Sequence, residues 1–298
     1  MKKKIGLMFM LVIATLIMFT GCQGTFEVDE ESSLDNGVEV DDESSLDNVV
    51  EADDESSLDN GVEADDESSL DNGVEVDEES SLNSIIEFDD ENLERAIREE
   101  INKPTGNVYL KDVKEIRELD LFNNNITDIS ALSNLTNLES LNLRRNKMTD
   151  ISSLANLTSL EGLYLENNNI TDISALSNLT SLEELRLWDN NITDISALSN
   201  LTNLEWLTLN ENNITDISPL ANLTNLEYLY LHENNITDIS PLSNLTNLEW
   251  LYLPNNNITD ISALANLTNL RGLSLQDNNI TDFSPLDNIP YIYRANYE

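Results

Sequence analysis

The feature that most constrains the fold is a 22-residue period that begins at Leu119. Equivalent leucines stand at positions 119, 141, 163, 185, 207, 229, 251 and 273, and each copy is close to L-x-L-x-x-N-x-I-T-D-I-S-A/P-L-x-N-L-T-N-L-E-x. One unit of this length cannot bury its own apolar face, whereas stacked copies share a continuous core. The period therefore predicts a repeat solenoid.

The spelling of the unit predicts where each part lies. In L-x-L, alternation turns both leucines inward and the flanking residues outward, so stacked copies form one parallel sheet on the concave side. The asparagine five places after the first leucine is expected to bond backbone groups as a ladder. The remaining Ile and Leu positions fill the core from a convex side of short 3₁₀ turns. Unit length and the L-x-L-x-x-N core fit the leucine-rich repeat, an α/β repeat solenoid with a horseshoe shape.

An amphipathic helix precedes the repeats. The stretch 88–101 begins with acids, carries apolar residues at Leu93, Ile97 and Ile101, and is followed by Pro104. These are helix start, face and stop signals. We expect a helical amino-terminal cap over 85–118 and repeats over 119–298. The last copy is a partial cap in which Ala295 and Tyr297 take the two leucine places.

The segments N-I-T-D-I-S-P-L and N-L-T-N-L-E-x-L resemble internalin-type repeats of bacterial surface proteins and related repeats of a protein-phosphatase regulatory subunit. The resemblance covers roughly residue 85 to the end. It implies the repeat fold and a binding role, and says little about the ligand. We recognise no immunoglobulin-like domain and no sortase-type tail after the repeats, so internalin ligands are not carried over.

The first 22 residues predict export. Lys2, Lys3 and Lys4 precede an apolar run over 5–19, and Thr20-Gly21-Cys22 follows. This is the pattern of a signal peptide over 1–21. The end of the run resembles the lipobox of bacterial lipoproteins, with Phe19 where Leu is usual, which implies that Cys22 carries a lipid and anchors the chain to the membrane. An uncleaved anchor and an ordinary signal cleaved nearby are the alternatives, and each places the rest outside the cytoplasm.

Residues 22–84 predict a disordered acidic stalk. Copies of D-E-S-S-L-D-N-G-V-E recur every twelve residues, and residues 27–79 hold 24 acids without Lys, Arg or His. So few apolar residues cannot offset the entropy of ordering the backbone. The helix–loop–helix calcium pattern fails, because Asn36, Leu34 and Ser32 stand at the ligand positions before Gly37. No metal site is expected.

Charge and residue content narrow the function classes. The net charge of -42 repels nucleic acid. A single cysteine and a single histidine exclude an intramolecular disulfide and a Cys/His metal cluster. No cofactor is expected. The repeats place no Ser, Cys or second His beside His232 for a nucleophile–base pair, so we expect a contact residue there and no enzyme.

The outward positions around L-x-L are the ones that differ among the copies. All three tryptophans and four of the eight tyrosines fall on them. Large exposed aromatics mark binding surfaces. The predicted partner site comprises Tyr164, Arg186, Trp188, Trp206, Tyr228, Tyr230, His232, Trp250 and Tyr252. The alternative is a ladder of rings that stack on one another and only stiffen the sheet.

These observations favour a monomeric, adhesin-like or receptor-like surface lipoprotein that binds an unidentified host or envelope protein on its concave face. Two other functions stay open. The chain could be a structural protein that self-associates in the envelope, or it could bind cell-wall glycan through its aromatics without hydrolysis. Hydrolysis itself lacks an acid pair.

Overall fold

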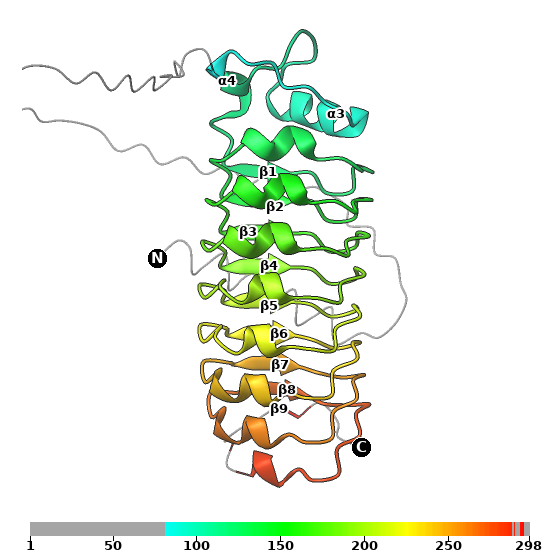
Figure 1. Ribbon diagram of the computed structural model, residues 1–298, viewed down its shortest axis with the longest axis vertical. Helices are drawn as coiled ribbons and strands as arrows, with labels where there is room; N and C mark the ends of the chain where they lie inside the picture. The colour runs from blue at the N-terminus through cyan, green and yellow to red at the C-terminus, as the bar shows by residue number, and fades with distance from the viewer. Residues whose placement is uncertain (1–80, 288, 290–292, 295–298) are drawn as a thin grey trace, which may run out of the picture. The chain divides into compact units, whose positions relative to one another are not determined.

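The computed structural model describes residues 81–287, 289 and 293–294. In this part the chain winds as a stack of coils, each with a short strand on one side and, in the repeats, a 3₁₀ turn on the other (Figure 1). The predicted signal peptide, Cys22 and nearly all of the predicted stalk lie outside the described residues.

Nine strands form one parallel sheet in sequence order, as the period predicts. Identical positions pair in successive strands, so that Leu119 lies opposite Leu141 and Leu207 opposite Leu229. The strands are β1 Glu118–Asp120, β2 Ser140–Asn142, β3 Gly162–Tyr164, β4 Glu184–Arg186, β5 Trp206–Thr208, β6 Tyr228–Tyr230, β7 Trp250–Tyr252, β8 Gly272–Ser274 and β9 Tyr293–Arg294.

The convex side consists of 3₁₀ turns, as expected for a unit too short to hold a long helix. Each begins at the serine of T-D-I-S, or of T-D-F-S in the last copy. The aspartate two residues earlier accepts from the backbone N–H of this serine, as in the 2.8 Å bond from Ser218 to Asp216. The turns are η1 Ser130–Asn134, η2 Ser152–Asn156, η3 Ser174–Asn178, η4 Ser196–Leu198, η5 Ser218–Leu220, η6 Ser240–Asn244, η7 Ser262–Asn266 and η8 Ser284–Leu286.

The asparagine ladder is confirmed. The Oδ1 of Asn212 accepts from the backbone N–H of Ile192 at 3.0 Å, and its Nδ2 donates to the carbonyls of Leu187 at 3.0 Å and Leu209 at 3.1 Å. These groups are buried, so the side chain satisfies backbone that water cannot reach. A second ladder, which the repeat pattern did not predict, runs along the T-N-L segments, as where Asn203 donates to the carbonyl of Thr180.

The residue just before each ladder asparagine adopts a left-handed backbone. Glu211 and Glu233 both have φ of 55°. This conformation is uncommon for residues other than Gly, Asn and Asp. It turns the chain off the sheet and carries these side chains along one edge of the concave face.

The helical cap is observed as α3 Glu91–Glu100 and the short α4 Leu110–Val113, with Leu93, Ile97 and Val113 buried against the core. Asp90 joins cap and repeats. Its Oδ1 accepts from the N–H of Leu93 at 3.0 Å, and its Oδ2 accepts from the N–H of Thr127 at 2.7 Å. One carboxylate therefore caps α3 and binds the loop of the first repeat.

The register of the last strand was predicted wrongly. Tyr293 pairs with Gly272 and Arg294 with Leu273, so Arg294 stands where Ala295 was expected. The connection into β9 is one residue shorter than in the other coils, and the strict period breaks at that point.

Candidate functional site

The concave face, meaning the outward side of the sheet, carries the predicted partner residues in two columns. The three-residue strands turn their central leucine inward, so the first and third residues point outward. Neighbouring strands lie about 4.8 Å apart, which is the distance at which flat rings can stack. Outward aromatics on successive strands are thereby brought into contact.

Five rings on β5, β6 and β7 form what we call the aromatic stack: Trp206, Tyr228, Tyr230, Trp250 and Tyr252. The ring centroids of Trp206 and Tyr228 are 4.4 Å apart with planes 18° apart, and those of Tyr230 and Tyr252 are 4.7 Å apart with planes 6° apart. Trp206 also lies 5.9 Å from Tyr230, and Trp250 lies 6.4 Å from Tyr252. The rings thus form one connected, rigid layer.

The expectation that all of these rings are exposed is wrong for two of them. Tyr228 is 9% exposed and Tyr230 only 7%, whereas Trp206, Trp250 and Tyr252 are half-buried. The neighbours in the stack cover the central rings. Burial raises the pKa of both buried tyrosines above its usual value, so their hydroxyls stay protonated. The outer rings therefore offer the surface that a partner could reach, and the inner rings support them.

Arg186 ends the stack on its amino-terminal side. Its guanidinium carbon lies 5.4 Å from the Trp206 ring and 5.3 Å from the Tyr164 ring, which are cation–π distances. Glu184 pairs with Arg186 through Nε at 2.7 Å and accepts from the Tyr164 hydroxyl at 2.9 Å. Burial, followed by the Glu184 charge, raises the pKa of Tyr164. Tyr164 and Arg186 are thus held by contacts within the chain.

Trp188 and His232 belong to the same face without joining the stack. Both are half-buried, and among the described residues no ring contact or cation–π pair involves Trp188. Burial lowers the pKa of His232, and the nearby Glu233 opposes that shift. His232 is consequently uncharged at neutral pH, so it suits a neutral contact with a partner better than a cationic one.

Three features of this face were missed from the sequence. Glu166 is only 2% exposed, its Oε1 is 3.7 Å from Arg144, and its Oε2 has no hydrogen-bond partner. Burial raises the pKa of Glu166 to about 7. The Thr208 hydroxyl and the Trp206 Nε1 are also buried without partners.

The third missed feature is a glycine. A β-carbon on Gly272 would come within 2.1 Å of the Trp250 indole, so only glycine allows the indole to lie where it does. A close comparison of the copies could have suggested this pairing, since Gly272 follows Trp250 in the same outward column.

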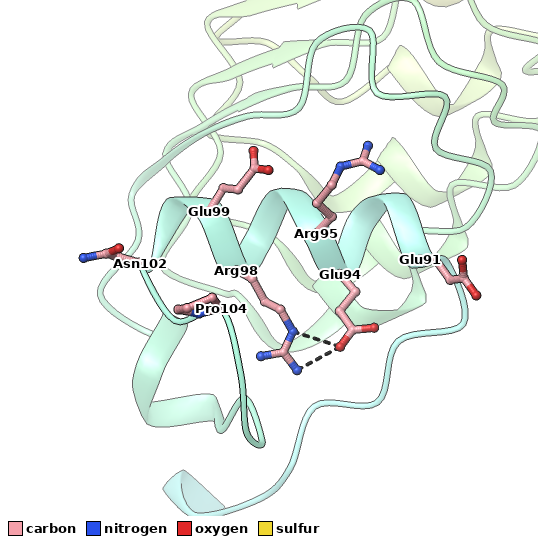
Figure 2. A pocket seen from close by; sticks show the side chains of 7 residues that line it. All are labelled: Glu91, Glu94, Arg95, Arg98, Glu99, Asn102 and Pro104. Carbon is pink, nitrogen blue, oxygen red and sulfur yellow. Dashed lines mark hydrogen bonds and ion pairs between the residues drawn. The ribbon is translucent and has the colours of Figure 1, made fainter.

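A separate hollow of about 550 Å³ lies on α3 (Figure 2). Figure 2 shows Arg98 reaching Glu94 across one helical turn, with Nε–Oε1 and NH2–Oε1 distances of 2.9 and 2.8 Å. Its lining is mostly charged, with Arg98 and Glu94 paired, and it includes no aromatic side chain. We therefore place the candidate site on the concave face.

Other kinds of site lack support in the part of the chain that the structure describes. There, no group of three or more His, Cys, Asp or Glu side chains is arranged to hold a metal ion. None of the helices described is long and apolar enough to cross a bilayer.

Comparison with known proteins agrees with this geometry. A model of paired leucine-rich repeats matches residues 114–156, 158–200, 202–244 and 246–288, more than half of the chain. The structure of internalin C2 from Listeria monocytogenes is similar with a TM-score of 0.67 and 41% identity, over 69% of this chain and 92% of that one. An internalin of the same organism, inlF, is 37% identical over 70% of this chain and 75% of its own, with a TM-score of 0.48.

A more distant match is the ectodomain of the plant receptor kinase GASSHO1/SCHENGEN3 from Arabidopsis thaliana, solved in complex with CASPARIAN STRIP INTEGRITY FACTOR 2. It is 25% identical with a TM-score of 0.55, over 62% of this chain and 24% of that one. A comparison with curated proteins gave no match. The matched family is a repeat family with a 22-residue unit, and the internalin match spans nearly the whole of the solved relative. The chain therefore belongs to the leucine-rich-repeat family and is of the internalin type.

Proposed function

We propose that this protein binds another protein through the aromatic stack on its concave face, as an adhesin-like or receptor-like protein of the cell surface. The observation that carries the proposal is the stack itself. Trp206, Trp250 and Tyr252 keep part of their surface open while the rings beneath them are fixed. Rigid aromatics lose little entropy on binding and supply much of the energy at interfaces.

The relatives support a protein partner. The plant ectodomain, which shares the repeat fold, was solved with CASPARIAN STRIP INTEGRITY FACTOR 2 bound. The partner of the present chain is not inferred from that complex. Only the general mode, a solenoid that presents a long face to another chain, is carried over.

Export and lipid anchoring at Cys22 belong to the same proposal. The motif Thr20-Gly21-Cys22 after the apolar run supports a lipid on this single cysteine. Replacing Cys22 with Ser is expected to abolish incorporation of a labelled fatty acid and to release the protein from the membrane fraction. Unchanged labelling of that variant would refute the anchor.

The binding role is tested by replacing Trp206 and Trp250 together with Ala in the full chain. Hot-spot aromatics each contribute about 2 kcal/mol or more, so affinity for a partner captured from envelope or host-cell extracts should fall about a hundredfold. Phe122→Ala is the matched control, because Phe122 also points outward from the sheet face, is 41% exposed and lies far from the stack along the solenoid. Normal binding by the double variant would refute the proposal.

Self-association through the same face is the second candidate. It is favoured by the open parts of Trp206, Trp250 and Tyr252, which a second copy of the chain would cover. Light scattering on the purified chain separates the two. A monomer at micromolar concentration supports a foreign partner. A dimer that Trp250→Ala dissociates would instead support the structural role.

A further inference from the structure

The aromatic stack lies between two rows of carboxylates. We call the glutamates that directly precede β4 to β7 the entry rim: Glu183, Glu205, Glu227 and Glu249. Their backbones are bonded in series, as in the 2.9 Å bonds from Glu227 to Glu205 and from Glu249 to Glu227, so the side chains repeat at the strand spacing. Burial raises the pKa of Tyr228, and the charges of Glu249 and Glu227 raise it further.

The opposite edge carries the exit rim, formed by Asp189, Glu211 and Glu233. These residues share the left-handed backbone position, each with φ of 55°, and are joined through the next coil by backbone bonds such as that from Glu211 to His232 at 3.0 Å. Burial raises the pKa of Glu211, and the charges of Glu233 and Asp189 raise it further. Because neighbouring strands lie about 4.8 Å apart, the exit rim is a row of like charges that repel one another.

Arg186 shows how a cation fits this surface. Its guanidinium lies over Trp206 and Tyr164 and is paired with Glu184. On β5 and β6 the corresponding place is taken by Thr208 and Tyr230, so the chain supplies no arginine at these two positions. The carboxylates continue along the strands, and the half-buried rings of Trp206, Trp250 and Tyr252 keep part of their surface open. At the carboxy-terminal end of the entry rim, Arg271 pairs with Glu249 at 2.7 Å, so a cation of the chain itself neutralises the last of these carboxylates.

We infer that the partner docks an extended, arginine-bearing basic segment on the stack, with its cations against the open parts of Trp206, Trp250 and Tyr252 and its charge balanced by the two rims. This inference rests on the proposed function and names the chemistry of the partner. The distance from β4 to β7 is about 14 Å, which roughly four or five extended residues span. Arginine suits the site better than lysine, because its planar head stacks on rings and binds carboxylates in parallel.

Charge complementarity disfavours the other occupants. A phosphate backbone or an anionic lipid surface is repelled by both rims. Residues 27–79 of this chain carry 24 acids and no basic side chain, so their charge repels them from the rims in the same way. A second copy of the same solenoid would bring carboxylates against carboxylates.

The test is a titration of the full chain with short peptides, in which tryptophan fluorescence measures the binding. All three tryptophans lie on the concave face, and peptides of alternating Arg and Gly, Lys and Gly, or Glu and Gly contain none. We expect the arginine peptide to bind severalfold more tightly than the lysine peptide and the glutamate peptide not to bind. The affinity should fall as salt is raised.

The decisive variant combines Glu227→Gln with Glu233→Gln, one carboxylate from each rim beside β6. It should weaken binding of the arginine peptide about tenfold. The control combines Glu99→Gln with Glu100→Gln, which removes the same charge from exposed positions on α3 and should change the affinity less than twofold. An equal loss in both variants would show attraction to the net charge alone and would overturn the inference.

Failure of the inference is distinguishable from failure of the proposed function. If the arginine peptide does not bind while a captured partner still depends on Trp206 and Trp250, the basic chemistry is wrong and the concave site stands. If the captured partner binds equally well when Trp206 and Trp250 are replaced, the proposed function is wrong, and the inference is wrong with it.

Discussion

The Trp250 indole lies directly over Gly272, on the neighbouring strand, at a distance that leaves no room for a side chain there. A β-carbon at Gly272 would meet Cε3 of the ring at 2.1 Å. The glycine of β8 therefore determines how the outermost tryptophan lies against the sheet.

Gly272→Ala is expected to displace the Trp250 ring from its place beside Tyr252. Overpacking of this kind costs about 1–3 kcal/mol, and moving the ring exposes it to water. Denaturant unfolding should show the loss of stability, and tryptophan emission should shift to longer wavelength. Gly162→Ala is the control, since the nearest atom to its β-carbon would be the Tyr164 hydroxyl oxygen at 3.2 Å, a far looser contact than the 2.1 Å at Gly272. Equal effects of the two changes would contradict the prediction.

Glu166→Gln should stabilise the protein at neutral and alkaline pH. Burial raises the pKa of this carboxyl to about 7, against an ordinary value of 4.5. A raised carboxyl pKa means that ionisation disfavours the fold, so stability falls as pH rises from 4.5 to about 7 and the loss is complete above that. Glutamine removes the charge, and the gain should be on the order of 1–3 kcal/mol at pH 8. At pH 4.5 the two proteins should unfold at the same denaturant concentration. A gain that is the same at both pH values would refute the assignment to ionisation.

Asp90→Ala should loosen the cap. Its carboxylate accepts from Leu93 on α3 and from Thr127 in the first repeat. Burial raises the pKa of Asp90, but the hydrogen bonds together outweigh it and lower the pKa to about 2. This stabilisation is present above about pH 4 and is lost as pH falls towards 2. We expect a loss of about 2 kcal/mol at pH 7 and faster hydrogen exchange in α3. Asp89→Ala, at the exposed neighbour, should have little effect.

Asn212→Ala should destabilise the solenoid strongly. It leaves one buried N–H and two buried carbonyls without their partner, at a cost of about 2 kcal/mol or more. Asn203→Ala removes one exposed bond from the second ladder, along the T-N-L segments, and should cost less than about 1 kcal/mol. Chemical denaturation of both variants measures the difference. Similar losses in the two variants would show that burial does not determine how much these hydrogen bonds contribute to the free energy of unfolding.

The sequence predicts the repeating part of the fold well, because each inward residue has the same neighbours and the same burial in every coil. Leu207 is buried for the reason that Leu119 is, and Asn212 bonds for the reason that Asn278 does. The period fails at β9, where the connection shortens by one residue.

The concave face is less predictable, because its side chains depend on unlike neighbours. Placing Tyr230 outward was correct, yet its burial results from Trp206 and Tyr252 together. The burial of Glu166 likewise depends on side chains from adjacent coils. A sequence pattern does not predict how much two unlike neighbouring side chains bury a third one between them.

The ladder asparagines bear on how the length of such a chain can change. From Asn146 onward, each one bonds to its own coil and to the coil before it through backbone groups, as Asn212 does. A duplicated stretch of one whole unit would find the same donors and acceptors on both sides, whereas an insertion of any other length would leave a coil without them. Genetic gain or loss of material is therefore tolerated in whole units, and the aromatic surface could be moved nearer to or farther from the cap without being redesigned.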